Sequence, residues 1–139
     1  MISRLESAKT LTVLSRGLDA ASQRHRIISN NIANVDTPGF KISGVKFEEA
    51  LSKVLNDDGI RGKKTNERHL PIGLPQYNEV YPKKFMFTDT YVRNDKNNVD
   101  IEAEMAKMEK NTIYFQACVT GMNGYLDNIS VAIQRGGGK

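Results

Sequence analysis

Two long stretches of this chain repeat apolar residues at alternating spacings of three and four. The first stretch comprises Leu11, Leu14, Leu18, Ala21, His25, Ile28 and Ile32, with His25 as its polar member. The second comprises Ile101, Met105, Met108, Thr112, Phe115, Val119, Met122, Leu126, Ile129 and Ile133. Such heptad spacing is typical of helices that pack lengthwise against each other. We call these two sets the N-helix seam and the C-helix seam.

The ends of both helices carry recognisable signals. Ser3 followed by Glu6 has the form of a capping box, and Pro38 bars continuation of the first helix much beyond Asn34. Asn98 or Asp100 is suited to begin the last helix, and three glycines at 136–138 end it. The pattern predicts a mainly α fold in which both terminal helices pair as an antiparallel coiled coil, a discontinuous rod domain of residues 1–35 and 98–135.

The intervening residues 36–97 predict a turn, a short helix and a loop-rich or small β segment. Residues 46–55 place apolar side chains at 47, 50, 51, 54 and 55, the spacing of a short amphipathic helix. Residues 85–87 and 90–92 are apolar enough for two short strands on either side of Asp89.

Further apolar rows lie beside the two seams. Val13, Ala20 and Ile27 recur every seven residues on the first helix, and Cys118, Tyr125 and Ala132 do so on the last. Two paired helices cannot bury several faces at once, so these rows predict self-assembly or packing into a larger bundle. Gly121 and Gly124 each cost a helix about 1 kcal/mol relative to alanine, which we interpret as room for another backbone.

Composition and charge exclude several classes of function. The net charge of +4 is spread along the chain, without the basic patch that nucleic acid requires. Cys118 is the single cysteine, and with only His25 and His69 it forms no zinc pattern. His25 in the seam is interpreted as a polar contact that sets register, with a pH switch as the alternative. No catalytic motif occurs, so we expect no enzyme and no cofactor.

The segment NNIANVDTPGFK at positions 30–41 is unusual for a helix end. Asparagine is a poor helix former, so its recurrence here predicts partners for the amides: the helix's last carbonyls and a neighbouring subunit. The segment resembles the N-terminal signature of the bacterial flagellar rod, hook and hook-associated proteins, and residues 98–105 and 111–117 are similar to their C-terminal helix. The matching residues of the turn are Asn30, Asn31, Ile32, Ala33, Asn34, Thr37, Pro38, Gly39 and Phe40.

This resemblance implies a structural subunit of the flagellar basal-body rod in the periplasm, most like the proximal rod members. It implies self-assembly through the terminal helices, transmission of torque, and type III export without a cleaved signal peptide. Implied partners are further copies, FlgC-like rod proteins, a FliE-like adaptor, the membrane ring and the export apparatus. The alternatives are a soluble coiled-coil adaptor or export chaperone, and the paralogous rod protein FlgC.

Overall fold

The structure, a computed structural model, describes residues 2–56, 66, 68, 76–87 and 96–136, with side chains of the first helix from residue 9 onward. The elements follow one another as α1 (Ile2–Ala33), β1 (Ser43–Lys46), α2 (Glu48–Asn56), the 3-10 turn η1 (Tyr77–Glu79), β2 (Lys83–Met86) and α3 (Ile101–Gly136). The expected mainly α fold, with long terminal helices, a short middle helix and a small β element, is confirmed.

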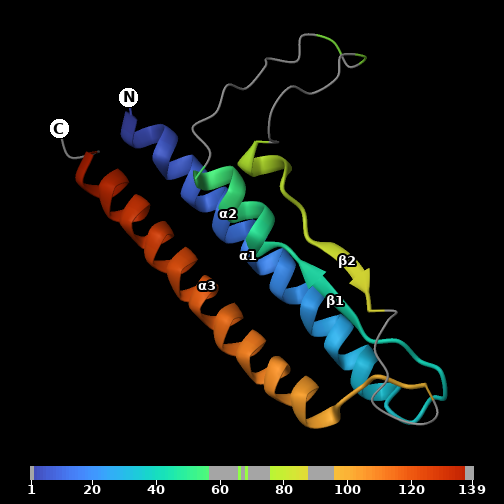
Figure 1. Cartoon of the computed structure of the whole chain (residues 1–139). Coiled ribbons are helices and arrows are strands. Elements are labelled where there is room, and N and C mark those ends of the chain that lie inside the picture. The colour runs from blue at the N-terminus through green and yellow to red at the C-terminus, as the bar shows by residue number, and fades with distance from the viewer. Residues whose placement is uncertain (1, 57–65, 67, 69–75, 88–95, 137–139) are drawn as a thin grey trace.

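Helices α1 and α3 lie side by side and run in opposite directions, so that the two chain ends lie near each other (Figure 1). Gly17 approaches Cys118 in the middle of the pair, whereas Asn31 near the end of α1 bonds to Glu104 near the start of α3. The pair therefore keeps one antiparallel register along its described length.

Strands β1 and β2 form an antiparallel pair that lies along α1, on the side where α2 also packs (Figure 1). Gly44 faces Phe85 across this pair, and a Cβ atom at Gly44 would come within 2.7 Å of the Phe85 ring. A side chain at position 44 would therefore require the Phe85 ring to move from its place over β1.

A small hydrophobic core joins these elements to α1. Ala20 and Phe47 are fully buried within it, and the remaining members are Val54 and Val80, flanked by Val45, Leu51 and Tyr77. Ile27 of the same α1 row is also buried. The expectation that the row through Ala20 and Ile27 needs another copy to cover it is wrong, because the chain's own middle segment covers it.

The β element differs in part from the prediction. The apolar run at 85–87 overlaps β2, but the partner of β2 is β1, which follows the turn directly. Phe87 extends the pairing by donating its backbone N–H to the Ile42 carbonyl at 3.0 Å. The second predicted strand, at 90–92, lies outside the described residues.

Candidate assembly surfaces

The turn after α1 is closed by local hydrogen bonds. The Asn34 side chain donates to the Asn30 carbonyl at 2.8 Å, and the Thr37 hydroxyl donates to the Asn34 side-chain oxygen at 3.2 Å. Gly39 has a φ of 72°, a left-handed conformation that favours glycine. Asn34 therefore satisfies a helix-end carbonyl as expected of a capping amide, while Thr37 and Gly39 direct the chain away from α1.

Asn97 fastens this turn to the start of α3. Its side-chain nitrogen donates to the carbonyls of Asn34, Val35 and Thr37 at 3.1, 2.9 and 2.9 Å. Its side-chain oxygen accepts the Val99 N–H at 2.7 Å, and the whole residue is buried. Sequence reasoning missed this residue, because its partners lie about 60 positions away and one asparagine among several gives no periodic signal.

Asn31 links three elements inside the chain. Its side chain exchanges two hydrogen bonds with the Ser43 backbone of β1, donating at 2.9 Å and accepting at 3.1 Å. It also donates to the Glu104 carboxylate of α3 at 2.8 Å, and Lys107 forms an ion pair with that carboxylate at 2.6 Å. Asn31 and Glu104 are almost completely buried. The Asn31 side chain thus finds its hydrogen-bond partners within the subunit, and not across a boundary between subunits as expected.

The close approach of α1 and α3 occurs at Gly17. A Cβ atom there would lie 3.2 Å from the Tyr114 hydroxyl and 3.3 Å from the Cys118 sulfur. Burial raises the pKa of Tyr114 to about 12, helped by Cys118 and Glu48, while Arg24 opposes the shift.

The two glycines singled out in the sequence of α3 are not sites of close approach. A Cβ atom at Gly121 would meet only the Leu14 side chain, at 3.5 Å, and nothing lies within 4 Å of a Cβ atom at Gly124. The expected close approach of a backbone is therefore not found at either one within the described chain.

The most buried residues of α3 lie beside the C-helix seam and not within it. The buried residues of α3 are Glu104, Asn111 and Cys118, a row with the same seven-residue spacing. Asn111 donates to the Ala21 carbonyl of α1 at 2.9 Å, which anchors that row. The two terminal helices thus pair as predicted, but the most buried residues of α3 form this row and not the C-helix seam, because polar contacts fix the register. Of the seam, Met108, Val119 and Met122 are half-buried; Ile101, Met105, Phe115, Leu126 and Ile129 are exposed.

The N-helix seam contributes to the pairing in part. Ala21 and Ile28 are buried, and Leu11, Leu14 and Leu18 are half-buried. His25 is exposed, so its expected place inside the seam is wrong: α1 turns that position to solvent. Of the remaining turn-motif residues, Ile32 and Phe40 are half-buried, and Asn30, Ala33, Thr37, Pro38 and Gly39 are exposed.

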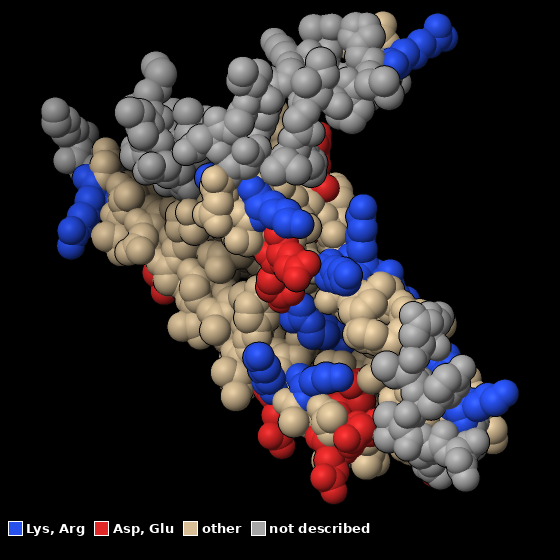
Figure 2. Space-filling model, viewed as in Figure 1, with Lys and Arg blue, Asp and Glu red and all other residues tan. Residues whose placement is uncertain are grey.

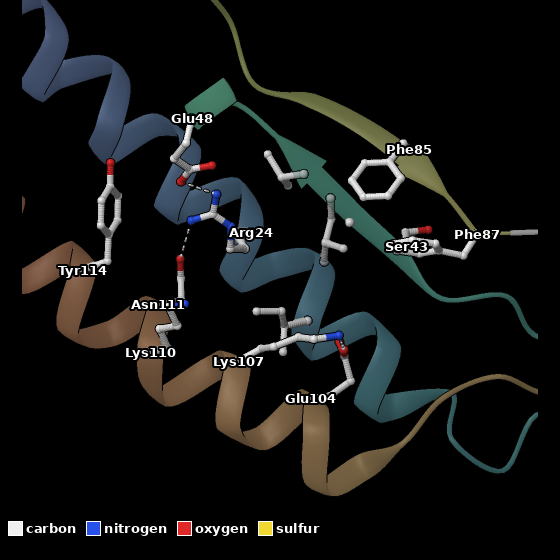
Figure 3. A pocket seen from close by; sticks show the side chains of 14 residues that line it. Arg24, Ser43, Glu48, Phe85, Phe87, Glu104, Lys107, Lys110, Asn111 and Tyr114 are labelled. Carbon is white, nitrogen blue, oxygen red and sulfur yellow. Dashed lines mark hydrogen bonds and ion pairs between the residues drawn. The ribbon is translucent and has the colours of Figure 1, made fainter. Parts of the chain in front are cut away.

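A cavity of about 500 Å³ opens between the β pair and the two long helices (Figure 3). Its apolar walls include Ile27, Val45 and Phe85, and charged side chains surround it. Arg24 crosses the cavity and donates to Glu48 at 2.5 Å and to the Asn111 side chain at 3.4 Å (Figure 3). The molecule therefore has two unlike surfaces: this cavity and the exposed C-helix seam.

Comparison with known proteins identifies the family. The family described as "Flagella basal body rod protein" matches residues 11–41, which span most of α1 and the turn. A flagellar basal body rod protein FlgB of Borreliella burgdorferi is 33% identical over 86% of this chain and 91% of its own length. FlgB of Bacillus subtilis is 31% identical over 91% of this chain and 95% of its own. The chain belongs to the flagellar basal body rod protein family.

Likeness to the rod protein family extends well beyond the turn, since FlgB of Proteus mirabilis aligns with 98% of this chain at 29% identity. The rod family is a structural one and not a class of enzymes. Within the described residues, no group of three or more potential metal ligands is found. In the same part of the chain, no helix is long and apolar enough to cross a membrane.

Proposed function

We propose that this chain is a subunit of the proximal part of the flagellar basal-body rod and assembles through its terminal helices to transmit torque. Membership of the rod family makes it a structural subunit of the basal body. The observation that supports assembly through the helices is the exposure of the C-helix seam: Ile101, Met105 and Phe115 are 43%, 54% and 41% exposed.

The position of that seam suggests how copies meet. Lys107 and Tyr114 of α3 line the cavity beside the β pair, whereas no residue of the C-helix seam does. At 3.6 residues per turn, Ile101 and Met105 lie on the other flank of the buried Glu104–Cys118 row. Burying these side chains in a neighbour contributes roughly 25 cal/mol per Å² of apolar surface removed from water. Many identical contacts of this kind make a stiff tube without any one being strong.

The proposed partners follow from the rod family. Further copies of this chain come first, then FlgC-like rod proteins on the distal side, and a FliE-like adaptor and the membrane ring on the proximal side. The flagellar export apparatus is the proposed route by which the chain reaches the rod. We infer no catalytic activity, because the work of such a subunit is mechanical.

Replacing Met105 by glutamate tests this function in a flagellated bacterium that lacks its own copy. Met105 is more than half exposed, so we expect the purified variant to keep its helical circular dichroism. A buried charge in the contact should abolish rods and swimming. Ala50→Glu, on the exposed surface of α2 and outside both the C-helix seam and the cavity, is the control and should swim normally. A Met105→Glu strain with the usual number of basal bodies would contradict the proposal.

A further inference from the structure

The cavity beside the β pair has the properties of a docking groove. Apolar side chains from α1 and both strands form its walls, and Phe87 at its edge is 44% exposed. Apolar surface of this kind, open on one side, is favourable to cover. The cavity lies on the flank of the helix pair opposite the C-helix seam, so one molecule offers two different contact surfaces.

The charge around this groove is mainly basic. Arg24, Lys107 and Lys110 lie on its helical side, and Lys46 lies over the Phe85 ring at 5.1 Å. Arg24 and Lys107 are paired with Glu48 and Glu104, but Lys110 has no acidic partner among the described residues. Figure 2 shows basic side chains over this face of the molecule, with acidic side chains in its middle and at its lower end. An occupant should therefore be apolar with acidic neighbours.

The outward face of α3 has that chemistry. Met105 is 54% and Ile113 is 68% exposed, and Glu102 and Glu109 beside them are exposed acids seven residues apart. Spacings of three and four residues place all four side chains on one helical face. Neither Glu102 nor Glu109 pairs with a basic side chain among the described residues.

We propose that the α3 ridge formed by Glu102, Met105, Glu109 and Ile113 of one copy docks into the groove between the β pair and α3 of a second copy. This proposal rests on the proposed function and specifies which surfaces meet. Ridge and groove lie on different sides of the molecule, so the contact is head-to-tail. Repeated head-to-tail contacts give a ring when the rotation between copies closes and an open helical assembly when it does not, and a rod requires the second form.

Cysteine cross-linking tests the contact directly, using Glu102→Cys and Lys110→Cys in the full chain with its own Cys118 replaced by serine. Positions 102 and 110 are eight residues apart on one helix, about 12 Å along its axis. Since a disulfide requires Cα atoms less than about 7 Å apart, a bridge between them forms only between copies. Oxidised basal bodies that carry the double variant should yield a ladder of covalent oligomers on a non-reducing gel.

The two single variants are the controls. Mixed together they should give heterodimers and nothing larger, because each copy then carries one half of the contact. Rods that contain the double variant but give no ladder would contradict docking of the ridge into the groove and would leave the proposed function intact. Homodimers of the single variants alone would overturn the head-to-tail arrangement. Wild-type basal bodies without this chain in their rods would overturn the proposed function itself.

Charge reversal provides a second measurement. Lys110→Glu and Glu102→Lys should each lower the number of rods per cell by at least about tenfold, since each places like charges face to face. The combined variant restores opposite charges and should return the number to within about twofold of wild type. A combined variant that assembles no better than the single ones would overturn the pairing.

Discussion

At the scale of single residues, Asn97 is the side chain on which the turn depends. Its fully buried side chain donates to the carbonyls of Asn34, Val35 and Thr37 and accepts the Val99 N–H. A buried group that loses its hydrogen-bond partner costs about 1–3 kcal/mol. Backbone N–H groups also reach the Asn34 and Thr37 carbonyls, so Asn97 adds a second donor to each and links the turn to the start of α3.

Asn97→Ala should therefore lower the free energy of unfolding by about 1–3 kcal/mol, the cost of a lost buried hydrogen-bond partner. Urea denaturation followed by circular dichroism measures this. Asn30→Ala is the control: the Asn30 side chain is exposed, and its backbone carbonyl still accepts from Asn34. Equal midpoints for Asn97→Ala and wild type would show that the three carbonyls find other donors.

Tyr114 gives the helix contact a dependence on pH. Burial beside Cys118 raises its pKa to about 12, above the ordinary value of 10.0, so the folded chain holds this proton more tightly than the unfolded chain. The corresponding stability is fully present below pH 10 and is lost as the pH rises toward 12.

Tyr114→Phe should remove that part of the alkaline loss of stability. An ultraviolet difference titration of wild type against the variant isolates the one phenol, and its midpoint should lie near pH 12. A midpoint near pH 10 would mean that the hydroxyl is solvated in the folded protein.

At the scale of elements, the extent of α3 could be predicted from the sequence, but the face that it packs on α1 could not. Its heptad repeat predicted a helix of almost the observed length, because apolar spacing is a property of the helix itself. The face that packs on α1 could not be predicted in the same way. Cys118 belongs to an apolar row noted beside the seam, but Glu104 and Asn111, which continue that row toward the start of α3, are polar residues that a count of apolar residues passes over. Their partners are a distant amide and a backbone carbonyl, which no local pattern encodes.

The middle segment illustrates the same limit. Helix α2 was predictable from its amphipathic spacing, and the apolar run at 85–87 indicated a strand. The pairing of β1 with β2 was not predictable, because Ser43, Gly44 and Lys46 are residue types that strands do not favour. Their strand conformation is set by Asn31 on one side and by the backbone of β2 on the other.

Two glycines in the long helices allow the contact between α1 and α3 to be tested. Gly124→Ala should stabilise the chain by up to about 1 kcal/mol, because alanine favours helix and meets no neighbour there. Gly17→Leu should destabilise it by about 1–3 kcal/mol, since Tyr114 and Cys118 already fill the space. Thermal unfolding of both variants measures the difference. Similar melting temperatures for the two would show that the helices do not meet at Gly17.

At the scale of the whole molecule, the described contacts are unevenly distributed. The turn, the β pair and the polar row of α3 gather at the end where α1 stops, and residues 126–136 of α3 are exposed. Few buried contacts hold that end of α3 in a single copy, and local opening follows the density of such contacts.

Amide hydrogen exchange should show this asymmetry. In the purified chain, we expect amides at 104–122 to be protected and those at 126–136 to exchange faster, with protection gained at 126–136 in assembled rods. Mass spectrometry of both forms measures it. Uniform protection of α3 in the purified monomer would instead favour a self-sufficient coiled-coil adaptor.

The position of Asn97 also orders the steps in which the turn becomes structured. The local hydrogen bonds of the turn need only residues 30–40, whereas the amide that fastens it belongs to a residue about 60 positions downstream. A fragment that ends at the β pair can therefore form the bend itself. It lacks the side chain that fixes this bend against the first residues of α3.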